Sequence, residues 1–228
     1  VGHVDWLRSK GYENSTWTFS RGLIDYSIWR KLITADDQLR QRVVHALSQI
    51  FVVSVDGVDI DYPFLSVGNF LDILDANAFG SHRTLLEQVT LSPAMGRSLS
   101  MLGSAKADGS GRRPDENYAR EVMQLFSIGL LELEPDGTRV MSNGAPVPSY
   151  DENDVTGLAR ALTGWAYAAP YDDHRGNRQL LPLVLQPQNH ETGEKRFLGV
   201  TIPAGTNGVD SLRIALDTIA AHPNVGPF

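Results

Sequence analysis

The densest group of side chains that could carry chemistry lies between positions 112 and 121. Glu116 and Arg120 are four residues apart, as are Asn117 and Glu121, so on a helix each pair shares a face. Apolar residues follow at once, which brings the acids close to a packed interior. Burial and a nearby arginine move carboxyl pKa values apart, and such a pair suits proton transfer or metal binding. The alternative is a helix start with ordinary ion pairs, because acids are common there.

A second polar group surrounds His190, with Asn189 before it and Glu191, Glu194 and Lys195 after it. A histidine beside carboxylates could ligate a divalent metal ion or transfer protons. The spacing matches no zinc motif, since the chain contains no His-Glu-x-x-His sequence. A loop histidine that only forms hydrogen bonds is the alternative. The sequence identifies neither a metal nor a cofactor.

Two further residues stand out by their surroundings. Trp165 follows Gly164 and precedes a stretch without periodicity, which makes it the best candidate among the tryptophans for a binding surface. His45 lies within the most apolar predicted helix and is interpreted as a core histidine. The glycine-rich motifs of nucleotide-binding loops and the Gly-x-Ser-x-Gly motif of hydrolases are absent.

Predicted helices position these groups. Apolar residues spaced by three and four indicate helices along most of the chain. Ser149 and Glu152 form a predicted capping box before the helix that ends near Gly164. The helix that begins near position 38 is apolar on nearly every face after Val43, which is typical of a core helix. The predicted helices cover residues 17–33, 38–55, 64–79, 81–89, 94–102, 114–128, 150–163 and 209–221.

The remaining segments predict little regular structure. Asp136-Gly137 and Asn143-Gly144 indicate a small hairpin or a pair of turns. Residues 165–208 show no helical period apart from a strand candidate at 196–202, and so long an irregular segment usually has a function. We therefore predict a mainly α fold: a multi-helix globular domain with a small β-hairpin and a long irregular segment.

Composition limits the classes of protein. The chain is 42% hydrophobic and 21% charged, which is ordinary for a globular domain. The absence of cysteine excludes disulfides and thiolate chemistry. A net charge of −7 argues against nucleic acid as a partner, and no apolar run is long enough for a membrane span. We expect residues 1–228 to form a single helical domain, and its ends suggest a fragment of a longer chain.

The run from Arg113 to Phe126, RPDENYAREVMQLF, resembles the central motif of the bacterial family catalogued as domain of unknown function eighteen hundred. The resemblance implies a mostly helical, exported protein, often encoded beside a sulfatase-like family. It implies no established reaction. It does make a functional role of four residues more plausible, because they lie in the motif: Glu116, Asn117, Arg120 and Glu121. Other blocks that resemble the family lie at residues 39–43, 46–50, 77–80, 93–96, 159–165 and 190–199.

Two main functions stay open, and whether the protein is an enzyme is one of the questions. The first is an exported hydrolase that acts on a polysaccharide or another extracellular polymer, which requires the helix of Glu116 to meet the loop of His190. Its predicted catalytic residues are Glu116, Glu121 and His190, and its predicted substrate-binding residues are Arg120, Asn117 and Trp165. The second is a non-catalytic assembly or binding module that acts with a sulfatase-like partner, and it predicts a broad apolar or aromatic exposed patch and fully satisfied Glu–Arg pairs without a pocket. A third is a metalloprotein that uses His190 with nearby acids.

Overall fold

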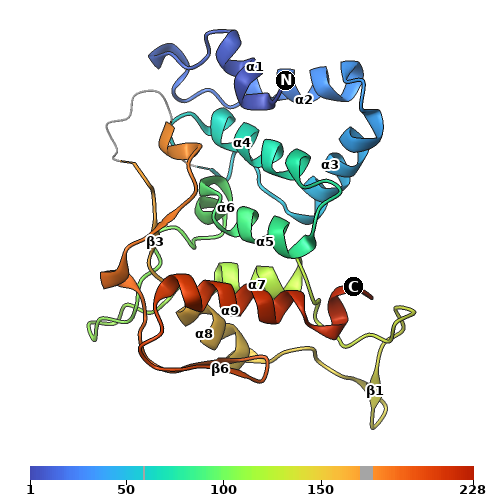
Figure 1. Ribbon diagram of the computed structural model, residues 1–228, viewed down its shortest axis with the longest axis vertical. Helices are drawn as coiled ribbons and strands as arrows, with labels where there is room; N and C mark the ends of the chain where they lie inside the picture. The colour runs from blue at the N-terminus through green and yellow to red at the C-terminus, as the bar shows by residue number, and fades with distance from the viewer. Residues whose placement is uncertain (59, 170–176) are drawn as a thin grey trace. The chain divides into compact units, whose positions relative to one another are not determined.

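A computed structural model describes residues 1–58, 60–169 and 177–228 (Figure 1). Part of the predicted irregular segment, residues 170–176, therefore lies outside the described residues. The described residues are mainly helical with short antiparallel strand pairs, which confirms the predicted fold class. No helix among them combines the length and the apolar character that crossing a bilayer requires.

The chain divides into two compact units. Unit 1 comprises Val1–Ser98 and Tyr167–Val184, and unit 2 comprises Leu99–Ala166 and Leu185–Phe228. That residues 1–228 act as one domain of a longer chain stays a prediction.

Unit 1 is built around α4 (Pro63–Ala76), which contacts five other helices. Most of the first two turns of α4 and its later residues Phe70 and Leu74 are buried, so this helix supplies the centre of the core. Asp72 of α4 also accepts hydrogen bonds from the backbone N–H groups of His3 and Val4, which caps the start of α1. The other elements are α1 (His3–Ser9), α2 (Leu23–Thr34), α3 (Gln38–Ile50), α5 (His82–Thr90), α6 (Pro93–Ser98) and the 3₁₀ turns Ser15–Trp17 and Asn177–Gln179.

Unit 2 is built around α8 (Glu152–Ala161), which packs against α7 (Asn117–Gln124), α9 (Gly208–Ala220) and β5 (Lys195–Phe197). Figure 1 shows α8 and α9 lying side by side next to the hairpin of β5 and β6 (Val200–Ile202). Gly157 permits this contact, because a Cβ atom there would lie 1.7 Å from the carbonyl oxygen of Arg196.

The remaining strands of unit 2 include the predicted hairpin. β1 (Met141–Ser142) pairs with β2 (Ala145–Pro146) around Asn143-Gly144, and both turn residues have positive φ, as a tight hairpin turn requires. Two further short strands, β3 (Trp165–Ala166) and β4 (Val184–Leu185), lie where the chain passes from one unit to the other in sequence.

Three of the local predictions for α8 and α3 are wrong. The capping box of α8 is formed by Asp151 and Asp154, while the Ser149 hydroxyl donates to the carbonyl oxygen of Gly129. The α3 helix ends at Ile50 and is no core helix, because it packs against α4 and α2 through one face only. His45 lies on the outer part of α3 and is exposed.

Candidate functional site

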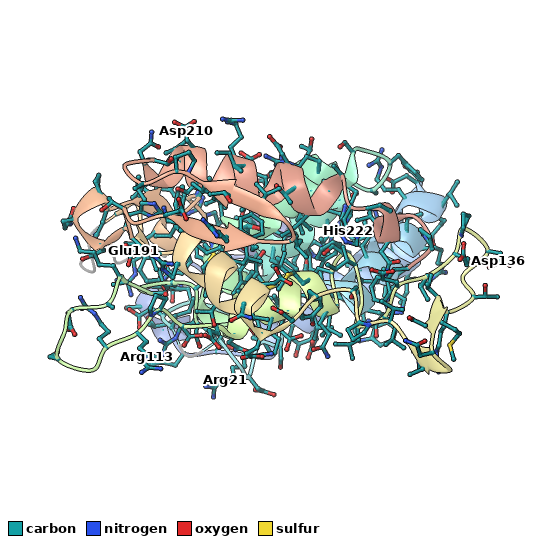
Figure 2. The ribbon with its side chains drawn as sticks, turned by 90° about the horizontal axis from the view of Figure 1, so that it is seen from below. Arg21, Arg113, Asp136, Glu191, Asp210 and His222 are labelled. Carbon is teal, nitrogen blue, oxygen red and sulfur yellow. The ribbon has the colours of Figure 1, made fainter. Side chains whose placement is uncertain are left out.

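All six predicted site residues lie in unit 2. Glu116 is the residue before the first turn of α7, and Asn117 is its first residue. Glu116 and Arg120 are half-buried, whereas Asn117 is exposed. Arg113, on the loop that leads into α7, projects outward (Figure 2). The start of α7 therefore presents its polar groups at the surface.

Arg120 lies at the centre of an ion-pair network between α7 and α8. Its guanidinium donates two hydrogen bonds to the carboxylate of Glu152, at 3.1 and 2.7 Å. Its Nη2 also lies 3.6 Å from Glu116, and Glu116 accepts a hydrogen bond of 2.9 Å from the hydroxyl of Thr156. The hydrogen bond from Arg120 lowers the pKa of Glu152. These charged side chains pair with one another, and the network links α7 to α8.

A polar row on α8 connects α7 to the loop of His190. Glu152, Thr156 and Arg160 are spaced by four residues, so they share one face over about 12 Å. The first two contact Arg120 and Glu116, as described above. Arg160 lies 3.9 Å from the carboxylate of Glu191, which is on the loop before β5 (Figure 2).

The segment around Ser104 makes a second connection. The carbonyl oxygen of Ser104 accepts a hydrogen bond from the N–H of Gly164, and the hydroxyl of Ser104 accepts one from the N–H of Asp115. Two residues later, the N–H of Lys106 donates to the carbonyl oxygen of Asn189. The start of α7 and the His190 loop are thus neighbours of the same segment, although among the described residues no hydrogen bond joins Glu116 or Glu121 to His190.

Glu121 of α7 is half-buried. Its Oε2 and the hydroxyl oxygen of Tyr150 are both buried, and neither forms a hydrogen bond within the described part of the chain. Burial raises the pKa of Tyr150, the charge of Arg120 opposes this, and the charge of Glu121 adds to it. Glu121, Arg120 and Tyr150 are therefore electrostatic neighbours. A carboxylate oxygen left without a partner is an acceptor available for chemistry or for a ligand.

His190 is almost completely buried, and its ring is held from both sides. Nδ1 lies 2.9 Å from the carbonyl oxygen of Thr163, and Nε2 lies 3.2 Å from the hydroxyl of Ser211 on α9. Because a carbonyl oxygen only accepts, the neutral ring carries its proton on Nδ1 and accepts from Ser211 through Nε2. Burial lowers the pKa of His190, against the hydrogen bond to Thr163. The ring is thus a neutral, hydrogen-bonded part of the interior.

The sequence placed Lys195 beside His190 but did not reveal its burial, and it did not reveal Ser211 as a member of this group. Both are fully buried, and Nζ of Lys195 lies 3.5 Å from the hydroxyl of Ser211. Burial lowers the pKa of Lys195, opposed by Glu191. The one available signal was strand alternation, which places Lys195 on the same inward face of β5 as Phe197.

The aromatic residues lie differently from the sequence-based expectation. Trp165 is only 4% exposed, and its Nε1 is buried without a hydrogen bond among the described residues. By contrast, Tyr26 and Trp29 of α2 in unit 1 are about two thirds exposed, at 64% and 63%. The signal for them was present, because apolar residues occupy almost every face of residues 23–33 rather than one stripe.

Comparison with known proteins places most of the chain in one family. The family model described as "Protein of unknown function (DUF1800)" matches residues 18–228. No curated protein and no solved structure matches the chain. Within the described residues, no group of three or more histidine, aspartate or glutamate side chains is arranged to hold a metal ion.

Proposed function

The chain belongs to the DUF1800 family of proteins of unknown function, and we propose that it is a non-catalytic binding module that docks onto another protein through α2. The observation that carries this proposal is the outer face of that helix. Tyr26, Trp29 and Ile33 are spaced by three and four residues, so they form one strip. We call these three residues the α2 strip. The opposite face of α2, with Leu23, Ile24, Ser27 and Lys31, is buried in unit 1.

The α2 strip differs from the scattered apolar residues of an ordinary surface. Single exposed apolar side chains are common, but a contiguous strip marks an interaction site. The three side chains are between 63% and 72% exposed. An aromatic side chain can bury roughly 150–250 Å², so the strip offers on the order of 300–400 Å² to a partner. That is about half of the ~800 Å² that each partner contributes to an interface of standard size. The α2 strip is therefore large enough to form the central part of such an interface.

The residue types also favour a protein partner. Tryptophan and tyrosine are enriched among the residues that dominate binding energy at protein interfaces. Phe19 and Leu39, which flank α2 in the sequence, are also exposed apolar side chains, at 78% and 73%.

The α7 motif supports the same choice of function. Glu116 and Glu152 both form ion pairs with Arg120. The most prominent charged group of the sequence is therefore engaged in contacts within the protein. A structural tie between α7 and α8 explains these residues without a reaction.

The partner that the family resemblance suggests is a sulfatase-like protein, and it is the first to test. We expect the purified chain to bind it, and the double variant Trp29→Ser/Ile33→Ser to bind roughly 30-fold more weakly, since loss of an interface anchor costs about 2 kcal/mol. Calorimetric titration measures both affinities. The matched control is Val209→Ser, which removes an exposed apolar side chain from α9. Equal losses for the double variant and the control would reject the α2 strip as the docking face.

A second candidate function, hydrolysis of a polysaccharide, is favoured by one observation. Glu121 keeps a buried carboxylate oxygen without a partner beside Arg120 and Tyr150, and a general acid needs such an unoccupied group. Release of reducing ends from a panel of extracellular polysaccharides tests it. Activity that Glu121→Gln abolishes and Glu134→Gln leaves intact would favour the hydrolase over the binding module.

We also propose that the chain works outside the cytoplasm, as the family resemblance suggests. The lack of cysteine is compatible with an oxidising compartment, where free thiols would be a liability. Fractionation of the native host, followed by detection of the protein in each fraction, tests this localisation.

A further inference from the structure

A groove runs between α2 and α3 on unit 1, on a different side of α2 from the α2 strip. We call it the α2–α3 groove. Its volume is about 240 Å³, and its apolar wall includes Ile28 and Leu32 of α2, with Leu71 of α4. The volume is just below the ~300–1,000 Å³ of typical sites for drug-sized ligands. The groove therefore suits a small molecule with an apolar part.

Polar side chains reach the same groove from three helices. Lys31 of α2, Gln41 of α3 and His3 of α1 line it, and each is more than nine-tenths buried. A few convergent polar groups in a mostly apolar site are what fixes a ligand's orientation. The amide nitrogen of Gln41 donates one hydrogen bond, 3.2 Å long, to Asp37, which leaves its second N–H and its oxygen for a ligand.

Among the described residues that line the groove, Lys31 carries a charge and none is a carboxylate. Nζ of Lys31 is bound to Asp75, which lies outside the groove lining and also receives a hydrogen bond to its carbonyl oxygen from Arg40. An ammonium group has three N–H donors, so Lys31 keeps two for a further acceptor.

The buried histidine does not add a second charge. Burial, together with the charges of Lys31 and Arg30 and against that of Asp75, lowers the pKa of His3 to about 3. Its Nδ1 lies 2.9 Å from the hydroxyl of Ser27. At neutral pH the ring is an uncharged hydrogen-bonding group, and Lys31 is the cation that the buried part of the groove presents.

We propose that the α2–α3 groove binds a small amphipathic anion, of the class of short-chain carboxylates. The carboxylate lies against Lys31 and Gln41, and the apolar chain lies along Ile28, Leu32 and Leu71. The site is separate from the α2 strip, so this proposal does not depend on the protein-binding function.

Calorimetric titration of the 228-residue chain with hexanoate tests the site. Hexanoate is expected to bind at one site, and hexan-1-ol, which has the same chain without the charge, roughly ten-fold more weakly. Hexylamine is expected not to bind, because its ammonium group would meet Lys31. An affinity for hexan-1-ol equal to that for hexanoate would overturn the proposal.

A matched pair of variants places the site without disturbing the core. His45 lines the groove and is exposed, whereas the neighbouring Ala46 is exposed but lies outside the lining. His45→Glu puts a negative charge beside the ligand and is expected to weaken hexanoate binding roughly ten-fold. Ala46→Glu adds a side chain of the same charge next to it in sequence and is expected to leave the affinity within about two-fold. Equal effects of the two variants would show that hexanoate binds elsewhere.

Discussion

Arg120 contacts two carboxylates, one just before α7 and one on α8, yet its side chain stays 37% exposed to solvent. Exposed ion pairs contribute little to stability, because water screens the charges and because two long side chains lose freedom. The value of this network lies in the relative placement of α7 and α8 rather than in a large gain of free energy.

We expect Arg120→Met to lower the free energy of unfolding by about 1 kcal/mol or less. Urea denaturation followed by circular dichroism measures the change. The control is Arg213→Met, which removes an exposed arginine paired with Asp210 and Asp217 of its own helix. A loss several times larger than that of the control would mean that the Arg120 network is a buried, essential ion cluster.

His3 makes a prediction about pH. The pKa of His3 is about 3 in the folded chain, whereas the ordinary pKa of histidine is 6.5. As the pH falls, the unfolded state therefore takes up the proton before the folded state does. The stabilising contribution of the neutral ring is complete above about pH 6.5 and is lost as the pH falls towards 3. The lowered pKa of His190 acts in the same direction.

Melting temperatures between pH 4 and 7 test this prediction. The parent chain is expected to lose stability more steeply on acidification than His3→Gln, which cannot take up the proton. His45→Gln, at an exposed position, controls for the loss of a histidine without burial. Parallel curves for the parent and His3→Gln would contradict the account of His3.

At the scale of elements, the contact between α8 and β5 depends on Gly157. Because the carbonyl oxygen of Arg196 lies where a Cβ atom would be, Gly157→Ala forces the helix and the strand apart. We expect a loss of about 3 kcal/mol or more, at the upper end of overpacking effects. Thermal unfolding measures it. Gly22→Ala, where the added Cβ meets nothing within 4 Å, is expected to change stability by less than about 0.5 kcal/mol, and equal effects of the two substitutions would contradict this contact.

The sequence predicts most helices and the β1–β2 hairpin turn, because their signals are local, whereas the single strand predicted at 196–202 is in fact the hairpin of β5 and β6. Apolar spacing locates α5 and α9 to within one residue and α4 to within three, and Asn143-Gly144 locates the β1–β2 turn. Helix ends are less predictable. The predicted helix from 114 to 128 shrinks to α7 (Asn117–Gln124), and at its C-terminal end the N–H groups of Phe126 and Ile128 donate to carbonyl oxygens five residues earlier rather than four.

The candidate site was only partly predictable, because its decisive contacts are long-range. The spacing of Glu116 and Arg120 predicts their ion pair, but Glu152 and Thr156 reach them from a helix more than thirty residues away. The burial of His190 depends on its contact with α9, and no local sequence pattern reveals that contact. The proposed catalytic and binding roles of the six residues stay predictions.

At the scale of the whole molecule, the proposed function depends on a surface rather than on a reactive group. The side chains of the α2 strip project away from the packed face of their helix, and the charged groups of the α7 motif bind one another. A binding module needs only such an accessible face on a folded scaffold, and its partner supplies the apolar surface that covers it.

Hydroxyl-radical footprinting with the proposed sulfatase-like partner tests this central claim most directly, because it reports the solvent exposure of individual side chains. Binding through α2 predicts that oxidation of Tyr26 and Trp29 slows about five-fold or more in the complex, in proportion to their loss of exposed area. Met141, exposed on β1, is the internal control and is expected to keep its rate. Unchanged oxidation of Tyr26 and Trp29 in a formed complex would contradict the account.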